Sequence, residues 1–487
     1  MHGSLSFGRL TIVVLWLCLL YVHYRAAPQA DPSAPAREAT VAAPGTASDG
    51  EERWTGVYLG KHKVGYSYER LAVDGPDYRF EERSLMRMNI LGSTQTVHAT
   101  VHGVAGPELA LRSFSLSIRS GAGVFAAHGT IGAGYIDLRV KTGGEERHQQ
   151  IPCTEPVYVP LLARERLARQ GLRPGAQITV PVFDPTSMQP QPLRLEVVGR
   201  ELESAGARWH VREELRHIET DVWLDAQGRV VRERGPLGFV TVRETQAEAM
   251  TGWSTEQAFD LMAAVSIPVQ HAIDAARTLQ HLTIRLDGVR GVVVPTDDRQ
   301  HVDGATLVVA RESLGDRPTY RLPYRDEAWQ GELVPTLFLQ SDHPRIRTAA
   351  GEALGGETDA RRAAELLRRW VFARLQKRPV ASIPNALEAL NMGAGDCNEH
   401  AVLFAALARA AGLPARVVAG LVYADGAFLY HAWNEVWLGT SWVSVDATMD
   451  QMPADATHIK LIAGGPEAHA GLVPLIGQLS IEVVSAG

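Results

Sequence analysis

A cysteine at the expected start of an apolar helix, followed by a histidine and an aspartate in β-like segments, most constrains how this chain can fold. Cys397 lies in the run G-D-C-N-E-H, His431 in Y-H-A-W and Asp446 in W-V-S-V-D. A thiol, an imidazole and a carboxylate in this order fit a nucleophile, a general base and an acid that orients the base. The pattern predicts an α+β domain whose tertiary fold brings the three side chains together.

The helix that follows Cys397 is predicted from its periodicity and its end signals. Residues 398–411 place apolar side chains on one face, and Gly412 and Pro414 then end the helix. Asp396 and Glu399 have the spacing of a capping box, so the helix should begin at or beside Cys397.

The start of a helix favours a thiolate, because the helix dipole is positive there. The backbone N–H of Cys397 would also be available to an oxyanion. We therefore expect Cys397 to be at least partly thiolate near neutral pH, paired with protonated His431. The alternative is an inert buried cysteine, which is a common state of free cysteine.

The residues after the helix are predicted to form three strands, 416–423, 428–437 and 442–446, separated by turn residues. Adjacent antiparallel strands can place His431 beside Asp446, so that the carboxylate accepts the imidazole N–H. Trp433 shares a strand face with His431 and either contacts substrate or belongs to the core. His400, near the first helical turn, either lines the cleft or is structural.

At these residues the chain resembles the transglutaminase-like superfamily, the papain-like thiol enzymes with a Cys-His-Asp triad. The motifs are G-D-C-N-E-H-A (395–401), G-L-P-A-R-V-V-A-G-L-V-Y (412–423), Y-H-A-W-N-E-V-W (430–437) and W-V-S-V-D-A-T (442–448). The resemblance covers roughly residues 360–462 and implies that Cys397 is the nucleophile, His431 the base and Asp446 the orienting acid. Asn434 and Ala447 stand where many bacterial members have proline, outside the triad.

The resemblance implies acyl chemistry at a thiol, since the family includes protein crosslinkers, peptidases, amidases and members without the cysteine. We expect an enzyme that cleaves amide bonds of a protein or peptide substrate through a thioester, as a transglutaminase or as a cysteine peptidase or amidase. The alternative is a non-catalytic envelope scaffold or binding protein. No cofactor and no metal ion are expected. His98 and His102 lie on one strand face but would be about 13 Å apart, which is too far for them to bind the same ion.

Composition describes an ordinary globular body. The chain has 487 residues, a net charge of −7 and 45% apolar residues, and it lacks the basic excess of a nucleic-acid-binding protein. Three cysteines are too few for a disulfide scaffold, so Cys153 is expected to be buried and free.

The N-terminus is predicted to be a targeting segment. Arg9 precedes the mostly apolar run 10–22, which is shorter than the roughly 20 residues of a full membrane span. Residues 1–25 are interpreted as a signal peptide or an uncleaved signal anchor, and 26–51 as a flexible linker. The protein is therefore expected on the periplasmic side of the inner membrane, either anchored by its N-terminus or released after cleavage.

Three further regions are predicted along the chain. Alternating segments favour a mainly antiparallel β domain at 52–255, and a smaller β segment at 256–340, with one strand expected at 320–324. Residues 341–487 are predicted to form the papain-like catalytic domain, made of a helical part and an antiparallel sheet.

Overall fold

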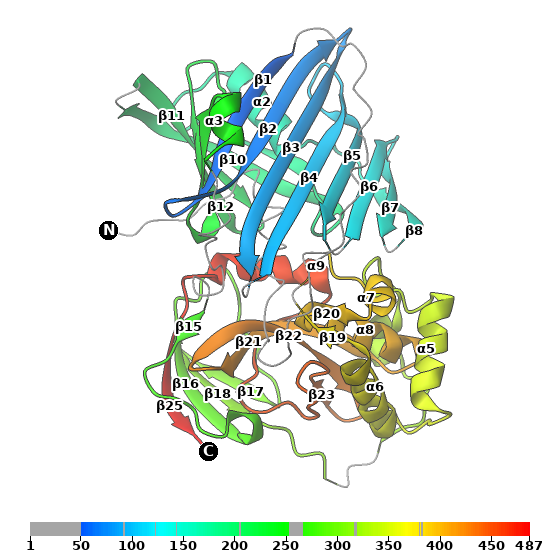
Figure 1. Ribbon diagram of the computed structural model, residues 1–487. Helices are drawn as coiled ribbons and strands as arrows, with labels where there is room; N and C mark the ends of the chain where they lie inside the picture. Colours follow the sequence, from blue (N-terminus) through cyan, green and yellow to red (C-terminus); the bar gives the residue numbers. More distant parts are fainter. Residues whose placement is uncertain are drawn as a thin grey trace.

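The computed structural model describes residues 50–487 except 91–92, 122, 143, 204–205, 253–265, 316–318, 379 and 381–382. A large antiparallel sheet occupies the N-terminal part, and a mixed body of helices and smaller sheets follows it (Figure 1). The predicted signal segment and nearly all of the predicted linker lie outside the described residues. Within the described part of the chain, no helix is long and apolar enough to cross a membrane.

The N-terminal sheet has 14 strands in the order β8-β7-β6-β5-β4-β3-β2-β1-β14-β13-β12-β11-β10-β9. Successive hairpins build each half of it, and β1 pairs with β14 to join the halves. Its strands are β1 (Glu51–Leu59), β2 (His62–Asp74), β3 (Asp77–Ile90), β4 (Ser93–Ala105), β5 (Leu111–Ser120), β6 (Gly123–Ile131), β7 (Tyr135–Thr142), β8 (Glu145–Pro152), β9 (Gln177–Asp184), β10 (Gln189–Glu203), β11 (Gly206–Leu215), β12 (Ile218–Leu224), β13 (Val230–Arg234) and β14 (Phe239–Glu244).

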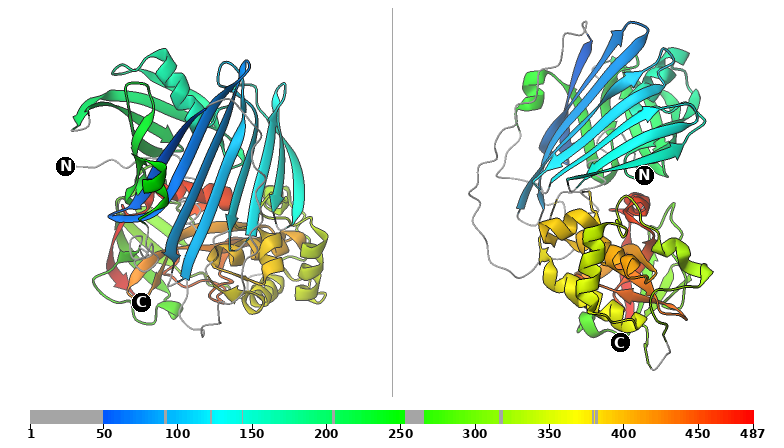
Figure 2. Two further views of the ribbon diagram at one scale, coloured as in Figure 1. Left: turned by 45° about the horizontal axis from the view of Figure 1, so that its top comes forward. Right: turned by 90° about the vertical axis from the view of Figure 1, so that its right-hand side faces the viewer.

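Alternating burial along strands such as β5 and β7 gives this sheet one buried face. In β5, Phe114, Leu116 and Ile118 are buried, whereas the residues between them are partly exposed. Helix α2 (Pro160–Gln170) connects the two halves and buries apolar residues against β9 and β10. Figure 2 shows the sheet curving strongly. A short helix, α3 (Gln246–Met250), follows β14.

A buried charge cluster joins α2 to the sheet. Arg164 forms two hydrogen bonds with the Glu213 carboxylate, one of them 2.8 Å long, and its guanidinium lies 3.0 Å from Glu233. All three side chains are almost completely buried. A cation held between two carboxylates offsets the cost of removing the three charges from water.

The C-terminal part is built on a sheet in the order β15-β22-β21-β24, with β23 paired to β22. Its strands are β15 (Ile267–Pro268), β21 (Ala415–Ala424), β22 (Ala427–Trp437), β23 (Trp442–Val445) and β24 (Ile459–Ala463). Helices pack on one side of it: α5 (Pro344–Leu354), α6 (Ala360–Arg374), α7 (Ala386–Met392) and α8 (Cys397–Ala410). Helix α8 contacts the other three and both β21 and β22, so it is buried from Cys397 to Arg409.

A four-stranded sheet completes this part, in the order β17-β18-β16-β25. Its strands are β16 (His281–Asp287), β17 (Gln300–Asp303), β18 (Thr306–Ala310) and the C-terminal β25 (Ser480–Ala486). Lys460 of β24 pairs with Glu435 of β22 in its own sheet and with Asp297 in the loop that precedes β17. Residues 266–310 thus share strand pairs and buried charges with the C-terminal strands; the domain boundaries themselves stay predictions.

The two parts of the chain meet where the β7–β8 hairpin touches the loops around α7. Asn385 donates to Thr142 (2.8 Å), and Thr142 donates to Glu388 (3.1 Å). On the far side of the hairpin, Arg147 pairs with Asp342 and Glu145 with His343, both at 2.7 Å.

The predicted α+β fold class, with a mainly antiparallel β region before the C-terminal domain, is confirmed. The strand expected at 320–324 is wrong. Arg321 makes only an isolated bridge with Asp359, and Tyr320 and Tyr324 pack edge to face. The two tyrosines therefore pack against each other in a loop, and they do not mark a strand.

Candidate active site

Helix α8 begins at Cys397, as the capping signal predicts. Asp396 is the N-cap, and its carboxylate accepts from the backbone N–H of Asn398 (2.8 Å). The Glu399 carboxylate accepts in return from the backbone N–H of Asp396 (3.0 Å), which completes the capping box. The thiol therefore lies in the first turn of the helix, where backbone N–H groups have no acceptor within the helix itself.

Strand β22 places His431 against the helix start. The backbone N–H of Ala432, the residue after His431, is hydrogen-bonded to the Cys397 sulfur. His431 pairs with Gly420 of β21, and Asn434 pairs with Val445 of β23, so Asp446 follows directly after the strand next to His431. Three elements that are separate in sequence thus meet at one point.

The imidazole and the carboxylate form the predicted hydrogen bond. Nε2 of His431 donates to Oδ2 of Asp446 over 2.8 Å. The other carboxylate oxygen, Oδ1, accepts from the backbone N–H groups of Thr448 (2.6 Å) and Met449 (3.0 Å). The carboxylate is therefore held on both oxygens, and it fixes the orientation of the His431 ring.

All three side chains are buried: Cys397 is 1% exposed, His431 3% and Asp446 0%. Burial raises the pKa of the Cys397 thiol well above its usual value, and the nearby acid Asp396 raises it further. Burial likewise lowers the pKa of His431 despite the Asp446 carboxylate beside it. The pKa of Asp446 lies well below its usual value: burial opposes this, but hydrogen bonds from His431 and His458 outweigh burial.

These directions overturn the expectation of a thiolate–imidazolium pair in this conformation. Desolvation penalises both charges, and it outweighs the favourable start of the helix. The structure instead favours a neutral thiol beside a neutral imidazole, with the charge on Asp446.

Trp433 and His400, the predicted substrate-contacting residues, are both buried in this structure. The Trp433 ring is nearly parallel to that of His431, with centroids 5.9 Å apart. His400 is bonded through Nδ1 to the main-chain oxygen of Asp396 (2.6 Å), and burial lowers its pKa to about 4. Their contact with substrate stays a prediction.

The two departures from the family pattern have different surroundings. Asn434 is completely buried and donates to the main-chain oxygen of Ala401 in α8 (3.0 Å). Ala447 is buried in the hydrophobic core.

A second histidine, His458, was missed by the sequence reasoning. Its Nε2 donates to the same oxygen of Asp446 as His431 does, over 3.1 Å. The Asp455 carboxylate lies 3.3 Å from Nδ1 of His458. The Arg277 guanidinium lies 3.1 Å from the same carboxylate. The run Asp455-Ala456-Thr457-His458 gives only a weak signal, a polar turn, and Arg277 lies far upstream.

His431, Asp446 and His458 are also the one group among the described residues whose ligand atoms could surround a metal ion, since these atoms lie within 4.8 Å of one another. The contacts of 2.8 and 3.1 Å are, however, those of imidazole N–H groups bonded to a carboxylate oxygen.

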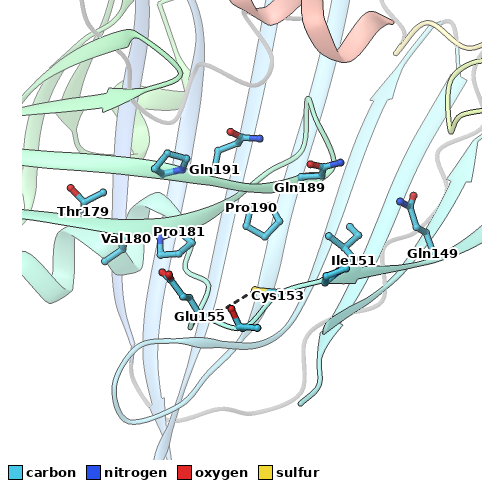
Figure 3. Close-up of a pocket in the computed structure, with 13 residues that line it drawn as sticks. Gln149, Ile151, Cys153, Glu155, Thr179, Val180, Pro181, Gln189, Pro190 and Gln191 are labelled. Carbon is cyan, nitrogen blue, oxygen red and sulfur yellow. Dashed lines mark hydrogen bonds between the residues drawn. The ribbon is translucent and has the colours of Figure 1, made fainter. Parts of the chain in front are cut away.

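A cavity of about 470 Å³ lies away from these residues, in the N-terminal sheet (Figure 3). It is lined by residues at the end of β8 and in the β9–β10 hairpin. Cys153 borders it, half-buried rather than buried as expected, and its thiol donates to the main-chain oxygen of Glu155 (3.1 Å). The cavity shares no residue with the thiol site.

Comparison with solved structures gives low similarity. A candidate cysteine protease from Cytophaga hutchinsonii (16% identity, TM-score 0.29) covers 43% of this chain and 85% of its own. A β-barrel-like protein of a domain of unknown function from Brucella abortus (10% identity, TM-score 0.32) covers 40% and 95%. A candidate protease from Parabacteroides distasonis (10% identity, TM-score 0.21) covers 81% and 69%.

A search of curated proteins finds no match. A family model does match, and it covers the segment from α5 to the residue after Asp446, including Cys397 and His431. Residues 347–447 match the transglutaminase-like superfamily, and the resemblance inferred from the motifs is confirmed for this part of the chain.

Proposed function

We propose that this protein is an exported thiol acyl-transfer enzyme that cleaves amide bonds of protein or peptide substrates through a thioester on Cys397. The observation that carries the proposal is the hydrogen bond from His431 to Asp446, made beside a cysteine at the first turn of α8. The match of residues 347–447 to the transglutaminase-like superfamily supports it. Export is inferred from the apolar run 10–22 alone.

The arrangement suits general-base catalysis. Since Nε2 of His431 is bonded to Asp446, Nδ1 is the nitrogen that would act toward the thiol. Sulfur attacks the amide carbonyl carbon while the thiol proton passes to Nδ1. The backbone N–H of Cys397 is one donor suited to the oxyanion that forms.

The second half of the reaction reverses these proton transfers. His431 returns the proton to the leaving amine as the C–N bond breaks, and a thioester remains on Cys397. Water or a second amine then attacks the thioester and gives its proton to His431. The thiol is restored, and the product is a carboxylic acid or a new amide.

Burial determines where the charges lie during this cycle. A neutral His431 can accept the thiol proton directly, and the Asp446 carboxylate then stabilises the imidazolium. Cys397 and His431 are charged only during the reaction. The water-excluded site tolerates these charges because the Asp446 carboxylate is already positioned to stabilise the imidazolium.

The second candidate function is a non-catalytic envelope scaffold that uses the papain-like domain for recognition. The near-complete burial of Cys397 favours this alternative, because substrate must reach a side chain that is 1% exposed.

Mass spectrometry with a labelled primary amine tests the proposal. The full chain and Cys397→Ala are incubated with envelope proteins and the amine. Amine incorporation by the wild type alone indicates transglutaminase activity, and new termini or deamidated side chains indicate a peptidase or amidase. Identical products from both proteins would overturn the enzyme proposal.

A further inference from the structure

His431 and His458 approach Asp446 from two elements and share one of its oxygens. His431 belongs to β22, and His458 immediately precedes β24. Their Nε2 atoms lie 2.8 and 3.1 Å from Oδ2. Two donors on Oδ2 and two backbone donors on Oδ1 leave the carboxylate little freedom to rotate.

The opposite side of the His458 ring faces a second carboxylate. Nδ1 lies 3.3 Å from Oδ1 of Asp455 and 3.2 Å from its main-chain oxygen. Among the described residues, the hydrogen-bond partners of both ring nitrogens are therefore oxygens that can only accept. A ring protonated on both nitrogens satisfies all of these contacts, whereas a neutral ring would face an acceptor with a lone pair.

Asp455 is itself held as an anion. Its carboxylate accepts from the backbone N–H of Thr457 (2.9 Å) and lies 3.1 Å from the Arg277 guanidinium. Arg277 also donates to the main-chain oxygen of Tyr423 in β21. The carboxylate behind His458 thus has a fixed position.

We propose that His458 is a positioning residue of the thiol site: an imidazolium that fixes the Asp446 carboxylate and places a positive charge behind His431. This proposal rests on the proposed function of Cys397. Both ring nitrogens of His458 are occupied by the carboxylates of Asp446 and Asp455, so we assign it no proton transfer with Cys397. The ring centroids of the two histidines are 5.6 Å apart, close enough for a charge on His458 to affect the protonation of His431.

The charges around His458 agree with this role. Burial alone would lower its pKa, yet the Asp455 and Asp446 carboxylates raise that pKa above the usual value. The positive charge in turn contributes to the lowered pKa of His431. Other charged or titratable groups that interact with Asp446 or His431 are Arg277, Arg368, Lys377, His400 and Cys397.

The charge has a consequence that can be measured. A positive charge on His458 lowers the pKa at which the Cys397–His431 pair loses its first proton. Without that charge, the rise of Cys397 reactivity at low pH (the low-pH limb) must move to higher pH, whether the proton leaves sulfur or nitrogen.

The test is the rate of iodoacetamide alkylation at Cys397 against pH, read by peptide mass spectrometry on the full chain. His458→Gln can retain a neutral donor to Asp446 and removes the charge, so its limb should move up by on the order of one to two pH units. Asp455→Asn keeps the ring but removes the carboxylate that holds its charge, and should shift the limb the same way. His469→Gln, at a buried histidine whose pKa burial lowers to about 4, is the control and should leave the limb in place.

A purely structural His458 would lower the melting temperature and leave the limb at its wild-type pH in both variants, and that result would overturn the proposal. If His458→Gln does not fold, Asp455→Asn decides. If His431→Ala leaves the pH profile of Cys397 alkylation unchanged from the wild type, that result would instead contradict the proposed function.

Discussion

Asn434 joins the strand of His431 to the helix of Cys397, because its Nδ2 donates across 3.0 Å to the main-chain oxygen of Ala401. Both residues are buried, so water cannot replace this contact without entering the core. Since the two reacting groups lie on different elements, the hydrogen bond helps to set the distance between them.

Asn434→Ala should therefore reduce both stability and reactivity. A buried hydrogen bond lost with one partner left behind costs about 1–3 kcal/mol. Urea unfolding should show this loss, and alkylation of Cys397 should slow. Asn391→Ala, at an exposed position of α7, is the matched control and should lower the free energy of unfolding by less than Asn434→Ala does.

The alkylation rate of wild-type Cys397 should rise with pH in two steps. The pKa of His431 is lowered, so the first step should fall below about 6.5, where the neutral ring becomes able to accept the thiol proton. The pKa of the thiol is raised, so the second step should lie above about 8.5. His431→Ala should remove the lower step only; a single step near the value of an ordinary thiol in both proteins would contradict the site described here.

Asp446→Asn should abolish most acyl transfer. An amide in place of the carboxylate cannot stabilise the imidazolium, and its NH₂ group would meet the N–H groups of two histidines. A loss on the order of 10³- to 10⁴-fold is expected in the rate of acyl-enzyme formation, followed by intact-protein mass spectrometry. Near-wild-type rates would show that His431 does not depend on this carboxylate.

Arg164→Met should destabilise the N-terminal sheet. Removing the cation leaves Glu213 and Glu233 buried without it, and such a change typically costs about 3–5 kcal/mol. Arg166→Met lies two residues away on the same helix, with an exposed hydrogen bond to the main-chain oxygen of Glu108. This control should cost less than about 1 kcal/mol in the same urea titration; equal losses would mean that the buried pair contributes nothing specific.

Glu388→Gln should stabilise the contact between the two parts of the chain at neutral pH. Burial raises the pKa of Glu388 above the value of about 4.3 that an unfolded chain would have. Because its pKa is raised in the folded protein, Glu388 stabilises the fold at pH values below its pKa in the unfolded chain. This stabilisation is lost as the pH rises through its pKa in the folded protein. The melting temperature of the variant should therefore exceed that of the wild type near pH 7, and the difference should shrink toward pH 4.

Local signals in the sequence were enough to predict the helix that starts at Cys397 and the strands that carry His431 and precede Asp446. Capping boxes, apolar periodicity and turn residues act over a few neighbouring positions, so the residues themselves determine these elements. The hydrogen bond between His431 and Asp446 follows from strand adjacency, which their spacing already favoured.

Only the tertiary structure decided the rest. His458, Asp455 and Arg277 come together through long-range packing that leaves no periodic trace, and the sequence does not reveal that one sheet has 14 strands. The ionisation of Cys397 depends on the same packing. The start of a helix favours a thiolate, but desolvation by side chains from distant elements outweighs it, and burial of that kind cannot be inferred from local sequence.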